Sequence, residues 1–251
     1  MSINNYLDNL SLSQDILTIS EKATTRGLQV GAKSVDEKTK SAVVSGSLIS
    51  FVDGINPQDT QDVLDTVQLA SRAADKSFDR FTQVRSWYGK YLEVLENVGW
   101  VADQFAFSGY NQDEGEFHMD EAAIGIISAI ATGNQLAVLQ TSVEALKKLS
   151  NGEKPIKVFE YYASSQDAGN FQLGSVQQGT TGTISMAMGA FNFKTVEDRK
   201  KFLFFSWKKE QIKFWTAAQK MTLNKSFYAA RRSKVQELIG ELADSYLAKL
   251  L

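Results

Sequence analysis

Cysteine is absent from this chain of 251 residues, and histidine occurs once, as His118. The absence of thiols excludes disulfides, thiolate metal sites, cysteine nucleophiles and acylation of cysteine. Acidic residues surround His118, but they lack the spacing of an EF-hand, and no G-x-S-x-G turn supplies a nucleophilic serine. A hydrolase would need His118 buried beside a serine or a carboxylate. We therefore predict no metal site and no catalytic activity, and we interpret His118 as part of a solvated loop.

The chain also lacks an excess of either charge and lacks long apolar runs. It has 27 basic and 29 acidic residues, a formal net charge of -2, so we expect no nucleic-acid partner. The best apolar run, 122–131, has about half of the ~20 residues that a membrane helix needs. The first 13 residues have no basic segment and no continuous apolar segment of a signal peptide. These absences predict a protein made in soluble form without a signal peptide. If it leaves the cell, it does so by lysis or by a dedicated, non-classical secretion route.

Proline occurs only twice, and each copy stands where an element is expected to begin. Asn56 and Pro57 combine a favoured N-cap with a favoured first helical position. Apolar residues then recur every three or four positions to about Asn97, which predicts one curved helix or two helices with a break near Gly89. The second proline, Pro155, opens a stretch rich in aromatic and β-branched residues. Because no linker and no internal repeat separates these parts, we predict a single domain over 1–251.

Four parts of this domain can be distinguished by their patterns. They are an N-terminal arm at 1–34, a mainly helical part at 56–150, the main sheet at 155–216 and a C-terminal helix at 226–250. The helical part ends in two helices separated at Gly133-Asn134. The strands predicted for the main sheet lie at 156–163, 170–178, 182–193, 201–208 and 210–216. The predicted fold class is an α/β protein, a single-domain α-β-α sandwich whose mostly antiparallel sheet is covered by helices on both faces.

The densest apolar run of the chain lies at 202–207. In a strand, alternate side chains point to opposite faces, so both faces of this run would be apolar and covered. One interpretation is a plain hydrophobic core. The other is a pocket for an acyl chain, with a bound fatty acid as its ligand and no other cofactor. The candidate lipid-binding residues are Phe202, Phe204, Phe205, Trp207, Phe214 and Trp215.

The order of these elements resembles that of the Cyt-type δ-endotoxin cytolysins, which are single-domain α-β-α sandwiches of about this length. The resemblance is clearest at the helix junction 129–133, the segment 156–162, the turn 177–182 and the segment 203–206. The chain is also similar to the small bacterial virulence factors called Evf, which carry a buried palmitate on a cysteine. Because cysteine is absent here, only a free fatty acid could be held in that way.

These resemblances imply a bacterial toxin-like protein, a virulence or insecticidal factor that is soluble at first. It would then act on the lipid membrane of a host cell, where it could form homo-oligomers. In Cyt-type proteins helices lift from the sheet and long strands engage lipid, which here would assign the first role to 120–150 and the second to 155–216. The alternative function is non-lytic binding of a fatty acid or another lipid in an apolar pocket between sheet and helices.

Overall fold

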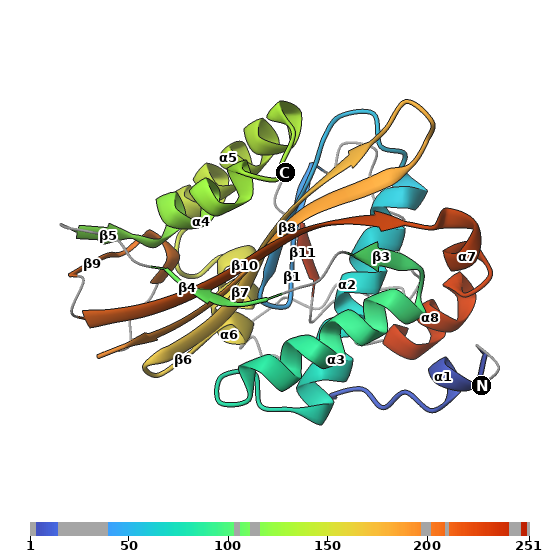
Figure 1. Cartoon of the computed structure of the whole chain (residues 1–251), viewed down its shortest axis with the longest axis horizontal. Helices are drawn as coiled ribbons and strands as arrows, with labels where there is room; N and C mark the ends of the chain where they lie inside the picture. Colours follow the sequence, from blue (N-terminus) through green and yellow to red (C-terminus); the bar gives the residue numbers. More distant parts are fainter. Residues whose placement is uncertain are drawn as a thin grey trace, which may run out of the picture.

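The computed structural model describes residues 4–14, 40–102, 106–110, 116–196, 202–208, 211–240 and 247–249. One mixed sheet lies between two groups of helices (Figure 1). Each face of the sheet is covered by its own cluster of buried apolar residues. The predicted fold class, a mostly antiparallel sheet with helices on both faces, is confirmed.

The main sheet has the strand order β11–β1–β2–β7–β8–β10–β3. All pairs in this path are antiparallel except β2 with β7, which run parallel. Two short strands pair at its margins, β4 (Ser108–Gly109) with β10 and β6 (Ser164–Ser165) with β7. The strands of the path are β1 (Ser41–Val44), β2 (Ser47–Phe51), β3 (Trp100–Ala102), β7 (Ala168–Gln178), β8 (Ile184–Thr195), β10 (Ile212–Leu223) and β11 (Leu247–Lys249).

The helices divide between the two faces of the sheet. On one face lie α2 (Pro57–Ser77), α3 (Val84–Asn97) and α8 (Arg232–Ile239), with the short α1 (Asn4–Asp8) and α7 (Lys225–Ala229) beside them (Figure 1). The opposite face is covered by α4 (Met119–Ser128), α5 (Gly133–Lys148), α6 (Lys154–Ala163) and the 3-10 turn η1 (Phe202–Phe204). A separate two-stranded sheet joins β5 (Glu116–His118) to β9 (Ser206–Lys208).

The long helical pattern after Pro57 forms two helices, and the break lies at 78–83 rather than near Gly89. The Asp79 side chain causes this break. Its carboxylate accepts hydrogen bonds from the backbone N–H groups of Phe81 and Thr82, at 2.9 and 2.7 Å. Such a local bond to an aspartate offers the backbone an alternative to the helix. Gly89 lies inside α3, where the helix continues without interruption.

The strand predicted at 156–163 is wrong, because this segment forms α6. Its aromatic and β-branched content favoured a strand, but the spacing of its apolar residues is helical. Ile156, Phe159 and Tyr162 are three residues apart and all buried, and Pro155 stands in the first turn. Here helical burial of one face prevails over the β-propensity of individual residues.

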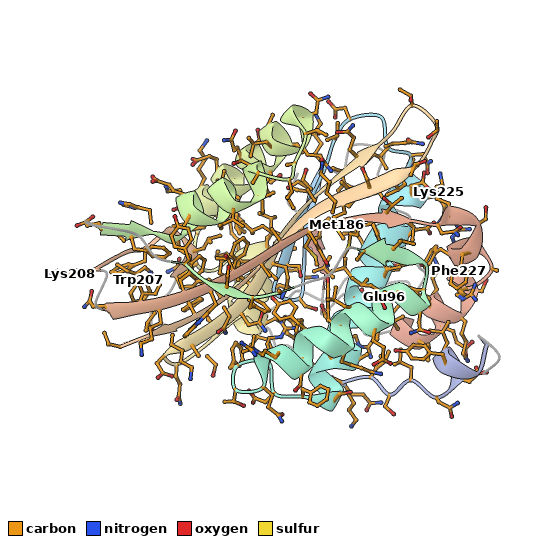
Figure 2. The ribbon with its side chains drawn as sticks, in the orientation of Figure 1. Glu96, Met186, Trp207, Lys208, Lys225 and Phe227 are labelled. Carbon is orange, nitrogen blue, oxygen red and sulfur yellow. The ribbon has the colours of Figure 1, made fainter. Side chains whose placement is uncertain are left out.

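The strand predicted at 201–208 is also wrong as a member of the central sheet. Phe202 and Leu203 are both buried, but they lie in the 3-10 turn η1 and not in an extended strand. The chain becomes extended only at 206–208, where β9 pairs with β5. Figure 2 shows Trp207 and Lys208 at one end of the molecule, away from Met186 in the main sheet.

The single helix predicted at 226–250 is wrong as well. The described part of this segment contains α7, α8 and strand β11. The helix α8 ends at Gly240, whose φ of 46° lies in the left-handed region that favours glycine. Of the N-terminal arm predicted at 1–34, residues 1–3 and 15–34 lie outside the described residues.

The helices α7 and α8 are held on α2 by a row of buried carboxylates. Lys225 Nζ lies 2.6 Å from Asp59 Oδ2. Arg232 donates two hydrogen bonds to Asp62, from Nε at 2.8 Å and from Nη2 at 2.6 Å. Because both carboxylates are buried, these charge-assisted contacts fix the position of α8 on α2.

The third carboxylate of the row, Asp65, is held by amides. It accepts hydrogen bonds from Gln61 at 2.6 Å and from Gln236 at 3.2 Å. Burial raises the pKa of the Asp65 carboxyl to about 6, and the neighbouring charge of Asp62 acts in the same direction. Because the pKa of Asp65 is higher in the folded state than in the unfolded state, protonation of Asp65 stabilises the folded protein. This contribution is fully present below the unfolded pKa of 3.8 and is lost as the pH rises through about 6.

Replacing Asp65 by asparagine is therefore expected to stabilise the protein at pH 8 by on the order of 1–3 kcal/mol and to change little near pH 4. The asparagine removes the buried charge. Its single oxygen can accept from one of the two glutamine amides, and the other glutamine must turn its own oxygen toward the new amide N–H. Urea unfolding at both pH values measures the difference. Asp53→Asn, at an exposed carboxylate, is the control and should show no such dependence. An equal effect of Asp65→Asn at both pH values would contradict the assignment.

Candidate functional site

The hairpin formed by β7 and β8 contains no charged residue between Asp167 and Lys194. Its strands have 11 and 12 residues and pair antiparallel along almost their whole length. The turn between them is built from threonine and glycine. Gly179 N–H donates to Thr183 O at 2.8 Å, and Gly182, with a φ of 81°, donates to Gly179 O at 2.9 Å. The hairpin is thus a long, regularly paired and uncharged part of the main sheet.

The face of the sheet that lies under α4, α5 and α6 is aromatic. We call its rings, together with those of α6 and η1 that touch them, the aromatic layer. Its centre is Phe171, whose ring centroid lies 5.0 Å from that of Phe191 and 5.5 Å from that of Phe202. The layer consists of Phe159, Phe171, Phe191, Phe193, Phe202 and Phe214.

Two glycines allow the rings to lie flat on the sheet. A Cβ at Gly169 would overlap the ring of Phe193, and a Cβ at Gly189 would lie 2.5 Å from Phe191 Cζ. Each ring thus occupies the space above a neighbouring glycine. The result is a close-packed apolar surface between the sheet and its helices, which favours the interpretation of these residues as a hydrophobic core.

The opposite face of the same strands is mixed in character. Methionines of β8 and β10 alternate there with four buried amides, which we call the amide row: Asn170, Gln172, Asn192 and Gln219. Asn170 accepts a hydrogen bond of 2.6 Å from the Tyr88 hydroxyl of α3, and it donates one of 2.9 Å to Arg80 O. Neither polar atom of the Gln219 amide has a hydrogen-bond partner among the described residues. The two faces of the hairpin therefore differ, one aromatic and the other containing amides.

The two helical layers are attached to the sheet differently. On the amide face, α3 is fixed by the buried bonds of Tyr88, and α2 by the bond of 3.0 Å that Trp100 Nε1 of β3 donates to Thr66 Oγ1. On the aromatic face, hydrogen bonds tie the first turn of α5 to β7. Gln135 Nε2 donates to Ser175 O, and Ser175 Oγ donates to Gln135 O, both at 2.8 Å. Beyond this turn, α4 and α5 rest on the aromatic face through buried apolar side chains: Ala123, Ile127, Leu139, Val143 and Leu146.

Of the six residues that the sequence singled out for lipid binding, five belong to or pack against the apolar cluster under α4, α5 and α6, and Trp215 does not. Phe202 and Phe214 belong to the aromatic layer. Trp215 follows Phe214 in β10, and because neighbours in a strand alternate, it lies on the opposite face.

The other three residues lie around η1 and β9. Phe204 and Phe205 are half-buried at the edge of the aromatic core, and Lys147 Nζ of α5 lies 5.9 Å from the centre of the Phe204 ring. Trp207 is buried, with its ring 5.0 Å from that of Phe205. The sequence analysis missed Phe171 and Phe191, because it placed the aromatic contribution of the sheet after position 201.

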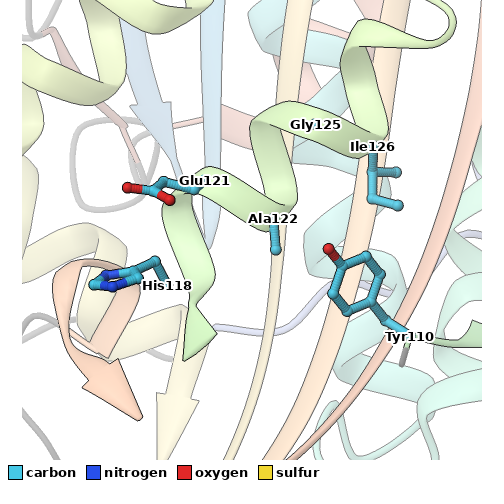
Figure 3. A pocket seen from close by; sticks show the side chains of 6 residues that line it. All are labelled: Tyr110, His118, Glu121, Ala122, Gly125 and Ile126. Atoms are coloured by element: carbon cyan, nitrogen blue, oxygen red, sulfur yellow. The ribbon is translucent and has the colours of Figure 1, made fainter. Parts of the chain in front are cut away.

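A hollow of about 460 Å³ opens on the surface beside the aromatic layer (Figure 3). Its lining comes from three separate parts of the chain: the residue after β4, the end of β5 and the helix α4. The residues are Tyr110, His118, Glu121, Ala122, Gly125 and Ile126. The sequence analysis assigned His118 to a solvated loop, whereas the structure places it at the end of β5 and at the N-cap of α4, half exposed, with Nε2 at 3.9 Å from Glu116.

Two further observations concern membranes and metals. Among the residues that the structure describes, no helix combines the length and apolar composition needed to cross a membrane. Within the same residues, no group of three or more histidines and carboxylates is placed to hold a metal ion.

Comparison with known proteins gives similarity of structure only. No protein-family model matches the chain, and no curated protein matches it. A delta-endotoxin structure is similar, with 11% identity, a TM-score of 0.43, and coverage of 81% of this chain and 90% of that one. The activated Cyt2Ba monomer from Bacillus thuringiensis subsp. israelensis has 12% identity and a TM-score of 0.45, covering 71% of this chain and 96% of that one.

The structure of the Evf virulence factor is also similar, with 10% identity, a TM-score of 0.39, and coverage of 100% of this chain and 92% of that one. The resemblance predicted from the order of elements is thus found in solved structures, at low sequence identity. The resemblance between this chain and these structures is one of fold.

Proposed function

We propose that this protein is a bacterial toxin-like factor that acts on the lipid membrane of a host cell by inserting the β7–β8 hairpin. The observation that carries the proposal is the absence of charge from Ala168 to Phe193. A basic side chain near the bilayer midplane destabilises a membrane strand by about 2–4 kcal/mol. Because β7 and β8 have no basic residue between Ala168 and Phe193, neither strand would incur this cost. The 11 and 12 residues of the strands also match the roughly 9–11 residues that a tilted membrane strand needs.

The turn of the hairpin supports the proposal. Residues 179–183 would have to cross the bilayer first, and they consist only of glycine and threonine. The backbone bonds of Gly179 and Gly182 remain within the turn during crossing. The threonine hydroxyls at 181 and 183 are 3.0 Å apart and can bond to each other. A turn of this composition has a low cost of transfer, because it carries no ion and leaves few polar groups unpaired.

The two faces of the hairpin suit the two sides of an inserted sheet. The part of the aromatic layer that lies on the hairpin would contact lipid, and the hairpin's part of the amide row would face water. The outer edges of the hairpin need backbone partners within the hydrocarbon, since unpaired strand edges are not tolerated there. Hairpins of several copies could supply these partners, which favours a homo-oligomer on the membrane.

The helices α4 and α5 would be the cover that is removed. They hide the aromatic layer in the folded protein, and their hydrogen bonds to β7 gather at the first turn of α5. Release of that turn would leave mainly apolar contacts, which a membrane can replace because lipid chains are as apolar as the core. The layer of α2 and α3, fixed by buried polar bonds, would stay on the sheet during the first step.

A charge placed in the turn tests the proposal. Thr180 is exposed, so Thr180→Asp should change the stability by no more than about 0.5 kcal/mol. It should nevertheless slow dye release from liposomes at least tenfold, because the carboxylate must cross the hydrocarbon. Asn151→Asp, in the exposed turn between α5 and α6, introduces the same charge outside the hairpin and should leave the release unchanged. Equal release by the two variants would refute insertion of the hairpin.

A further inference from the structure

The surface hollow plays no part in the insertion proposed above, and its lining has a defined chemical character. His118 and Glu121 lie at one end, and Tyr110 and Ile126 at the other, with Ala122 and Gly125 of α4 between them (Figure 3). Glu121 is an exposed carboxylate, and no lysine or arginine is among the lining residues. The hollow of about 460 Å³ falls in the range of roughly 300–1,000 Å³ that is usual for small-ligand sites.

We propose that this hollow binds an alkylammonium group. The carboxylate of Glu121 would attract the cation at one end of the hollow, and the ring of Tyr110 at the other end would contact the alkyl part of the ligand. The apolar wall of Ala122 and Ile126 suits the alkyl substituents, which an inorganic cation lacks. The same ammonium group occurs on free amines such as choline and on the head groups of choline lipids, so the chemistry is shared by a soluble and a membrane-bound source.

The aromatic wall of the hollow is held in place before any ligand arrives. The ring of Tyr110 meets those of Phe117 and Phe214 edge to face, at 6.0 and 5.9 Å. Its backbone N–H donates to Phe214 O at 2.9 Å. Phe214 belongs to the buried aromatic layer, so Tyr110 is anchored to the core although it reaches the surface. A preorganised ring of this kind reduces the ordering cost of binding.

Gly125 keeps the hollow open. It lies inside α4, where glycine is less favourable than alanine by about 1 kcal/mol. Packing does not require it, since a Cβ at this position would meet no atom within 4 Å. Positive φ does not require it either, because Gly125 is not among the residues with positive φ. The missing side chain leaves the space that the ligand would fill.

The test is titration of the intact protein with tetramethylammonium, followed by NMR or calorimetry. We expect saturable binding that Glu121→Gln and Gly125→Leu each weaken at least tenfold, the first by removing the charge and the second by filling the hollow. The matched controls are Glu144→Gln, at an exposed carboxylate of α5, and Gly89→Leu, at a glycine of α3 whose Cβ would also meet nothing within 4 Å. Both controls should bind as the parent protein does.

Absence of saturable binding, or binding that the two hollow variants leave unchanged, would overturn the proposal. This experiment contains no membrane, so its failure is distinct from a failure of hairpin insertion. A second arm compares free choline with vesicles of phosphatidylcholine and of phosphatidylglycerol. Retention on phosphatidylcholine vesicles that Gly125→Leu abolishes would identify a lipid as the source of the ammonium group, and binding of free choline alone would identify a soluble amine.

Discussion

Replacing Phe171 by alanine is expected to remove about 3–5 kcal/mol of stability, the range found when a buried phenylalanine is truncated. Phe171 has no exposed surface, and its ring touches those of Phe159, Phe191, Phe193 and Phe202. The truncation would leave a cavity in the middle of the aromatic layer, which the sheet beneath cannot fill. The loss is a large share of the ~5–15 kcal/mol stability of a typical domain. Thermal and urea unfolding would measure it, together with a lower yield of folded protein.

Tyr161 provides the matched control for this prediction. It is also aromatic, it lies in the adjacent helix α6, and half of its surface is exposed, at 50%. Tyr161→Ala should change the stability by about 0.5 kcal/mol or less. If Phe171→Ala and Tyr161→Ala unfold alike, the aromatic layer is not the core of this face.

A disulfide between α5 and β7 is expected to abolish membrane lysis while preserving the fold. Gln135 and Ser175 are the chosen positions because they are in direct contact: each donates a hydrogen bond to the backbone carbonyl of the other, at 2.8 Å. The double variant Gln135→Cys with Ser175→Cys would fasten the cover at the turn where its hydrogen bonds gather. Since the chain has no cysteine of its own, no other bridge could form within a molecule. Closing this loop should also stabilise the folded state by about 3–4 kcal/mol.

Dye release from liposomes would be compared before and after reduction of the bridge. We expect release at least tenfold slower in the oxidised form and restored by a reducing agent. The single variant Ser175→Cys, which cannot form the bridge, should release dye equally in both conditions. Equal lysis by the oxidised and reduced double variant would show that the cover does not need to lift.

The sequence predicted best those elements whose boundaries are marked by local chemistry. The N-cap Asn56 and the following Pro57 located the start of α2, and the Asn56 side chain accepts from Asp59 N–H as expected of a cap. The turn around Gly179 and Gly182 separated two strands that were predicted within two residues of β7 and β8. In each case a few residues that are adjacent in the sequence are enough to locate the boundary of the element.

The wrong predictions concern segments whose secondary structure depends on contacts with residues far away in the sequence. The segment after Pro155 has strand-like composition but helical spacing of its apolar residues, and packing of its buried face against the sheet favours the helix. The run from Phe202 has no strand partner at its own place in the fold, so it forms η1 instead. The surface hollow could not be predicted at all, because Tyr110, His118 and α4 become neighbours only through the fold. The one available signal was Gly125, a glycine inside an otherwise favourable helical pattern.

The pairing of β1 with β11 has a consequence for synthesis of the protein. Ala42 pairs with Lys249, so strands at opposite ends of the described chain share a ladder. At about 5–20 residues per second, translation needs roughly 10–40 s to proceed from the first of these strands to the second. During that interval the outer edge of β1 is an open ladder on the nascent chain, available to other nascent chains on the same polysome. Completion of the sheet must follow translation of β11, and a chaperone that shields an open strand edge should raise the yield of the folded protein.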